Sequence, residues 1–152
     1  MRGLLEIGAA AGRDDLIAAA RIIGDAMLAA LPANGFLPGR FNEQWQPTVK
    51  WSCLTGDCQL GINWGRLHQL TGESKYAQAT TKILQFVKRT QDLTGANPDT
   101  RGGIQGSHPI NGGYHPWQYP NWATKFYADA LLMDIANTEK LPYHLAGPKN
   151  TA

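Results

Sequence analysis

The chain has 152 residues, of which 43% are hydrophobic and 17% charged, and its formal net charge is +2. These values are typical of one globular domain and exclude a disordered chain. The 14 basic residues are scattered along the sequence, so we expect no nucleic-acid partner. No apolar run approaches the ~20 residues that cross a bilayer, and the sequence as given shows no signal peptide. We therefore expect no membrane span and a cytoplasmic location, provided that residue 1 is the true start of the protein.

Five segments have apolar residues at helical spacing. These expected helices are 2–11, 14–31, 54–71, 74–92 and 121–137. Asp14 and Ser74 are the expected N-caps of the second and fourth helices, because short polar side chains can bond the free amides of a first turn. No segment shows the alternation of a β-strand, so the predicted fold class is all-α.

The two long connections between these helices are related to each other. Gly35 and Gly103 lie 68 residues apart, and so do Trp51 and Tyr119. The short turns "GRDDL" at 12–16 and "GESKY" at 72–76 also match. The sequence therefore predicts a repeat of helical hairpins, which stack because one hairpin cannot bury its apolar face alone. Such an array has short turns at one end and long glycine- and aromatic-rich loops at the other, where function usually lies.

The first hairpin is shorter than the second. Gly12 matches Gly72, so Met1 falls opposite Gly61, inside the third helix. We therefore expect 1–140 to be one incomplete domain of a longer protein, whose missing N-terminal hairpins would pack against it. The remaining segment, 141–152, is expected to be a loosely ordered tail.

Two carboxylates are the best candidates for acid–base chemistry. Asp57 falls in the first turn of the third helix, and Glu43 lies in the first long loop beside Trp45. Most glycoside hydrolases use a pair of carboxylates as their catalytic residues. The simpler interpretations also stand: Asp57 complements the helix dipole, and Glu43 is a solvated loop residue.

The second long loop carries most of the other candidates. His115 could move a proton, because histidine titrates near neutrality; a hydrogen bond to the backbone is the alternative role. Four large aromatic residues lie within nine positions and suit stacking on sugar rings or packing between hairpins. The expected substrate-binding residues are Tyr114, Trp117, Tyr119, Trp122, His108 and Arg101.

The two cysteines, Cys53 and Cys58, do not form a disulfide framework or a recognisable zinc motif. We expect them to pack near the start of the third helix, and we expect no metal and no cofactor.

Parts of the sequence resemble a known architecture. "CLTGDCQLGINWGRLHQLTGESKYAQAT" at 53–80 resembles the inner-helix, turn and outer-helix unit of α/α-toroid proteins. Within it, "LHQLTGESKY" at 67–76 is similar to the hairpin turn of six-hairpin glycosidase-like proteins. The segments "GFLPGR" at 35–40 and "GGIQGSHP" at 102–109 also look like loops of terpenoid-cyclase and prenyltransferase-like toroids.

The first resemblance implies a carbohydrate-active protein that binds or processes a polysaccharide or oligosaccharide at the long-loop end. Asp57 would then be the general acid or base, with Glu43 as its partner. The second resemblance implies an aromatic pocket for an isoprenoid, although the chain has no Asp-x-Asp-Asp or Asp-Asp-x-x-Asp motif. A non-catalytic helical scaffold is the third possibility.

Overall fold

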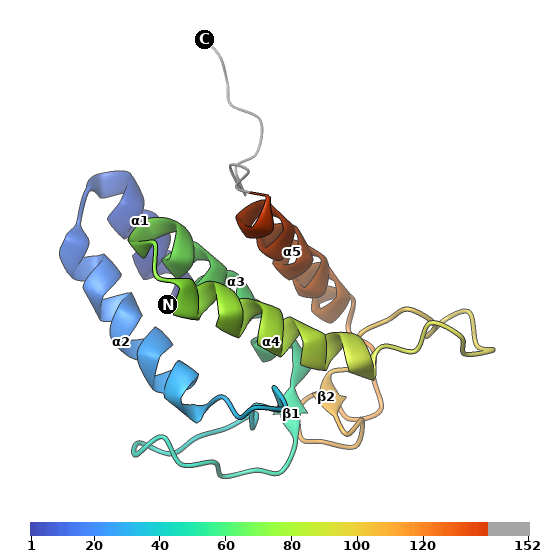
Figure 1. The fold of residues 1–152 in the computed structure, drawn as a ribbon. Helices are drawn as coiled ribbons and strands as arrows, with labels where there is room; N and C mark the ends of the chain where they lie inside the picture. Colours follow the sequence, from blue (N-terminus) through green and yellow to red (C-terminus); the bar gives the residue numbers. More distant parts are fainter. Residues whose placement is uncertain (140–152) are drawn as a thin grey trace.

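The computed structural model describes residues 1–139, so the expected tail at 141–152 lies outside the described residues. The described part is mainly helical, as the sequence predicts (Figure 1). The helices are α1 (Arg2–Ala11), α2 (Asp14–Ala30), α3 (Leu54–Thr71), α4 (Ser74–Thr90) and α5 (Asn121–Thr138). None of these five is long and apolar enough to cross a membrane.

Glycines end the first helix of each hairpin. Gly12 after α1 has φ 63° and Gly72 after α3 has φ 73°, a left-handed conformation that glycine adopts at no steric cost. One residue then separates each glycine from the next helix. The N-caps are therefore Arg13 and Glu73, and neither side chain makes a capping bond. The predicted capping roles of Asp14 and Ser74 were wrong, because these short turns place both residues inside the first helical turn.

Helix α3 lies at the centre of the molecule and packs along both α4 and α5 (Figure 1). Trp64 in its middle is fully buried, and the indole N–H donates to the carbonyl oxygen of Gly24 in α2 at 3.0 Å. On the other side, Gln69 Nε2 donates to Asn137 Oδ1 in α5 at 2.9 Å. Because neighbours cover it on several sides, α3 buries both apolar and polar residues.

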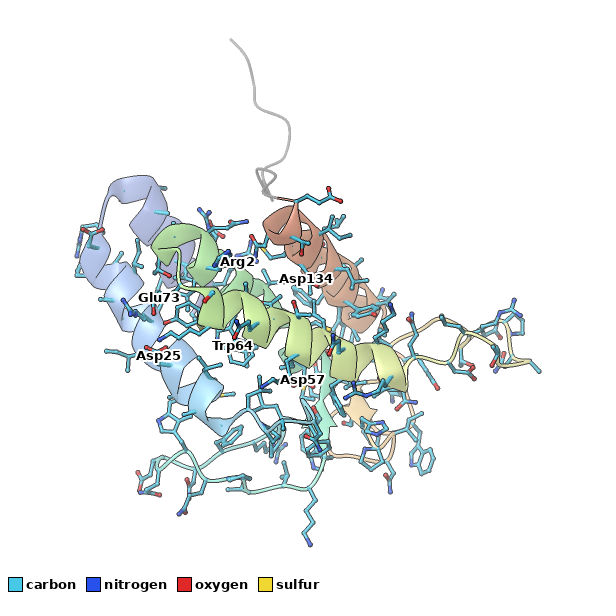
Figure 2. The ribbon with its side chains drawn as sticks, in the orientation of Figure 1. Arg2, Asp25, Asp57, Trp64, Glu73 and Asp134 are labelled. Carbon is cyan, nitrogen blue, oxygen red and sulfur yellow. The ribbon has the colours of Figure 1, made fainter. Side chains whose placement is uncertain are left out.

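Ion pairs join α2 to the start of α4. Arg21 of α2 lies 2.6 Å from Glu73, and Lys75 of α4 lies 2.9 Å from Asp25 of α2. The hydroxyl of Tyr76 also donates to Asp25 at 2.8 Å. Figure 2 shows Asp25 and Glu73 on adjoining elements. These contacts fix the first hairpin against the second.

The short turns lie at one end of the helices and the long loops at the other (Figure 1). Two short strands, β1 (Ser52–Cys53) and β2 (Ser107–His108), pair antiparallel and join the two long loops. The sequence did not predict these strands, because two residues are too few to show an alternating pattern.

The long loops also interlock through Trp51. Its side chain packs against Gly112 and Gly113 of the second loop, and a Cβ added at Gly112 would lie 2.7 Å from the Trp51 Cβ. Within the first loop, the Gly39 N–H donates to the Trp51 carbonyl at 2.7 Å. Gly112 and Gly113 thus leave the space that close packing between the loops requires.

Candidate functional site

The first candidate site is built around Asp57. The side chain lies in the first turn of α3, is only 3% exposed, and accepts a hydrogen bond from the Ser52 hydroxyl of β1. Burial raises the pKa of Asp57 to about 8, and the bond from Ser52 lowers it by less. Asp57 is therefore mostly protonated at neutral pH, because its burial outweighs the expected attraction of a charged carboxylate to the helix dipole.

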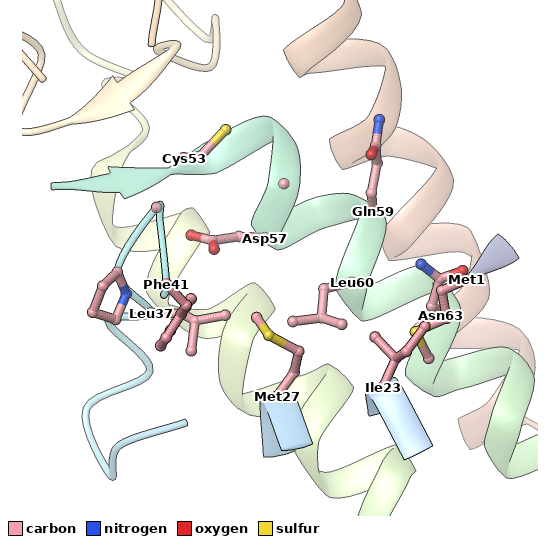
Figure 3. A pocket seen from close by; sticks show the side chains of 13 residues that line it. Met1, Ile23, Met27, Leu37, Phe41, Cys53, Asp57, Gln59, Leu60 and Asn63 are labelled. Atoms are coloured by element: carbon pink, nitrogen blue, oxygen red, sulfur yellow. The ribbon is translucent and has the colours of Figure 1, made fainter. Parts of the chain in front are cut away.

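Asp57 borders a cavity of about 290 Å³ between α2, α3 and the loop segment 37–41 (Figure 3). We call this space the Asp57 cavity. Most of its wall is apolar, and three polar side chains line it. The apolar lining includes Ile23, Met27, Leu37, Phe41 and Leu60, and the polar lining residues are Asp57, Gln59 and Asn63.

Glu43, the predicted partner of Asp57, is not among the residues that line the Asp57 cavity. It is exposed and accepts a hydrogen bond from the Gln44 side-chain amide at 2.8 Å. Asp57 is the one carboxylate in the lining of this cavity. Of the two carboxylates that the sequence suggested as a pair, only Asp57 thus lines this cavity.

The second candidate site is a group of three rings, Tyr114, His115 and Trp122, which we call the aromatic cluster. The His115 ring lies edge-on to both neighbours, with centroids 4.8 Å from Tyr114 and 5.0 Å from Trp122. The Trp122 indole N–H donates to the Tyr114 hydroxyl at 3.1 Å. Trp122 nevertheless remains 41% exposed, and nearby in the chain Trp117 is 71% exposed.

The backbone of this loop is held in an unusual conformation. His115 has φ 45° and Trp117 has φ 61°, values that side-chain-bearing residues rarely adopt. Ser107 fixes the loop: its hydroxyl donates to the Tyr114 carbonyl at 2.6 Å and accepts from the Tyr114 N–H at 3.0 Å. Such strain persists only where the surroundings enforce it, and it is common at functional sites.

The other predicted binding residues lie outside the aromatic cluster. His108 is half-buried in β2 with its ring edge-on to Phe86, and its Nδ1 is buried without a hydrogen-bond partner. Tyr119 is half-buried against Gly103. Arg101 is exposed, and its backbone N–H donates to the Asn97 carbonyl at 3.0 Å.

The two sites are separate, because no ring of the aromatic cluster lines the Asp57 cavity. The strand pair connects them. Ser52 of β1 bonds Asp57 and pairs with His108 of β2, and the adjacent Ser107 holds Tyr114. His115 therefore belongs to the aromatic cluster and does not line the Asp57 cavity.

Both cysteines are free and lie at the start of α3. Burial is the main cause of the raised pKa of the Cys53 and Cys58 thiols, which makes them poor nucleophiles. Among residues 1–139, no three histidine, cysteine or acidic side chains are grouped as metal ligands.

Sequence reasoning missed two residues of the Asp57 cavity and its surroundings. Asn63 is 9% exposed, and its Oδ1 has no hydrogen-bond partner. Ser52 is fully buried, and its hydroxyl donates to Asp57. The only sequence signal for Asn63 was a polar residue beside Trp64 in an otherwise apolar stretch, and Ser52 had none.

Comparisons with models of known protein families, with curated proteins and with solved structures gave no match.

Proposed function

We propose that this protein binds an oligosaccharide or polysaccharide at its long-loop end, with the aromatic cluster and Trp117 as the sugar platform. The observation that carries the proposal is that the Trp122 ring is exposed and yet held in a fixed orientation. Its ring is 41% exposed, yet it is held by the Tyr114 hydroxyl and the edge of His115. An exposed ring with a fixed orientation is suited to stacking on the apolar face of a sugar.

Preorganisation strengthens this argument. Ordering a mobile side chain on binding costs roughly 0.5–1.5 kcal/mol, and that cost is avoided when the ring is already fixed. The bonds of Ser107 to Tyr114 and the 3.0 Å contact of His115 Nδ1 with Gln118 Oε1 supply this order in the free protein.

The helical-hairpin repeat and the α/α-toroid architecture belong to the same proposal. Helices α2 and α4 each have 17 residues, and each begins two residues after a left-handed glycine. Helices α3 and α5 each have 18 residues. The bonded pair Gln69 and Asn137 lies 68 residues apart, the same spacing that relates the two long loops.

Our proposal concerns binding rather than hydrolysis. A carboxylic acid that keeps its proton at neutral pH suits a general acid, and Asp57 has that property. Its predicted partner Glu43 is exposed and lies outside the Asp57 cavity. A glycosidase uses two carboxylates, whereas Asp57 is the one carboxylate in the lining of this cavity.

Binding to a glycan array, followed by calorimetric titration of the hits, tests the proposal. We expect Trp122→Ala and Trp117→Ala each to weaken binding about tenfold, because one ring stack contributes on the order of 1 kcal/mol. Trp45→Ala is the matched control: Trp45 is 44% exposed, has φ 59° and lies in the other long loop. The proposal is wrong if no glycan binds, or if the folded Trp122→Ala and Trp117→Ala variants bind as tightly as Trp45→Ala.

A further inference from the structure

We propose that the Asp57 cavity is a second binding site, for a small, uncharged aliphatic molecule that carries hydroxyl groups. This site is separate from the aromatic cluster and does not depend on the proposed sugar binding.

The wall of the cavity selects an aliphatic ligand. Ile23 and Met27 of α2 face Leu60 of α3, and Leu37 and Phe41 close the side formed by the first long loop (Figure 3). A volume of about 290 Å³ lies near the lower limit of small-molecule sites. An apolar body there gains the free energy of leaving water, as any buried alkyl group does.

Polar groups stand at two ends of this apolar wall. Asp57 and Asn63 are six residues apart on α3, which places their Cα atoms about 9 Å apart along the helix axis. Figure 3 shows Leu60 and Met27 between them. The Oδ1 of Asn63 is buried without a partner, and an unsatisfied buried acceptor is costly. A ligand hydroxyl would satisfy it by donating a hydrogen bond.

The ionisable groups around the cavity favour an uncharged ligand. Ser52 donates to one oxygen of Asp57, and burial keeps that carboxyl protonated at neutral pH. The thiols of Cys53 and Cys58 lie near it and are also uncharged, because burial raises the pKa of each.

The other sides of the cavity add no charged side chain. From α2 and the 37–41 segment only apolar side chains reach it, and the remaining titratable group on a lining residue is the α-amino group of Met1. An anion would thus find the α-amino group of Met1 but no basic side chain, and an ammonium ion would require Asp57 to lose its proton. A hydroxyl can accept a hydrogen bond from the protonated acid without either cost.

Three eight-carbon probes of different charge test this inference on the intact protein: 1,8-octanediol, octylamine and octanoate. Binding is measured by calorimetry and by NMR shifts at pH 6 and pH 9. We expect the diol to bind at pH 6 and to bind about tenfold more weakly at pH 9. Asp57 loses its proton near pH 8, and an apolar ligand would then have to cover a charged carboxylate, which burial disfavours. Octanoate should bind more weakly than the diol at pH 6.

We expect octylamine to bind more tightly at pH 9 than at pH 6, because its ammonium group is attracted to an ionised Asp57. The inference is overturned if octylamine binds more tightly than the diol at pH 6, if diol binding strengthens as the pH rises, or if no probe binds the folded protein at millimolar concentration. These outcomes are independent of any glycan result.

Variants identify the groups responsible. Asn63→Leu should weaken diol binding about tenfold, whereas Asp57→Asn should keep binding at pH 6 and remove its pH dependence. Gln85→Leu is the control, since Gln85 is exposed on α4 and does not line the Asp57 cavity, and we expect less than a twofold change. If Asp57→Asn does not fold, the pH series on the unchanged protein still decides the matter. Equal affinity of Asn63→Leu and Gln85→Leu would contradict the proposed contact.

Discussion

The starts of α3 and α5 follow similar long loops, yet the structure uses them differently. At the start of α3, Leu54 and Asp57 are buried. The positions 68 residues later hold Trp122, which is 41% exposed, and Lys125, whose side chain is 60% exposed and ion-paired with Asp129. The difference follows from position: α3 is covered by helices on several sides, whereas α5 packs mainly on α3.

A long loop that leads into a helix start thus has two different roles in this protein. In the loop before α3, the side chain of Trp51 packs against Gly112 and Gly113 of the second loop, and this contact holds the two loops together. The loop before α5 has no further hairpin beyond it among the described residues, and its rings remain at the surface. The buried helix start forms the Asp57 cavity, and the exposed one forms the aromatic cluster.

The largest expected effect is on the pH dependence of stability. The pKa of Asp57 is about 8 in the folded protein and about 3.9 in an unfolded chain. The folded state therefore holds a proton that the unfolded state has lost between these values, so stability falls as pH rises from about 4 to 8. The expected slope is about 1.4 kcal/mol per pH unit, which adds up to about 5–6 kcal/mol over the whole range.

Urea unfolding at a series of pH values measures this slope. Asp57→Asn should flatten the curve, because the amide does not titrate. Lys125→Gln, at the corresponding position of α5, should follow the unchanged protein closely. If the slope of Asp57→Asn equals that of the unchanged protein, Asp57 does not hold its proton in the folded state.

The next effect compares the two matching first-turn positions. Leu54→Ala should lower the free energy of unfolding by about 2–5 kcal/mol, because it opens a cavity at a fully buried site. Trp122→Ala should lower it by less than about 1 kcal/mol, since an exposed ring contributes little packing. Chemical denaturation of both variants decides the point, and equal losses would show that the two helix starts are not as different as the structure indicates.

The smallest of these effects concerns the contact between the loops. Gly112→Ala should destabilise the protein by about 1–3 kcal/mol, because the added methyl group would overlap Trp51 and Ser107. Gly3→Ala in α1 is the control, as a Cβ there meets nothing within 4 Å and alanine favours a helix. Thermal unfolding of the two variants is sufficient, and a Gly112→Ala protein as stable as Gly3→Ala would rule out close packing of the loops.

Much of the helical framework was predictable from the sequence. Apolar spacing and the glycines at 12 and 72 located all five helices to within a few residues, because local periodicity and left-handed helix ends are encoded locally. The intrahelical pairing of Lys125 with Asp129 was equally local. The sequence also indicated Asp57 and the rings near 114–122 as chemically unusual.

What the sequence could not supply was how distant segments meet. The pairing of β1 with β2, the insertion of Trp51 between glycines of both loops, and the partnership of Ser52 with Asp57 depend on contacts across the fold. The same is true of the absence of Glu43 from the cavity that Asp57 lines, and of the buried, unpaired Asn63 Oδ1. Local sequence determined which segments are helical and where they end. Only tertiary packing decided which of two similar loops buries its side chains, because burial depends on the neighbours that cover a helix and not on its own residues.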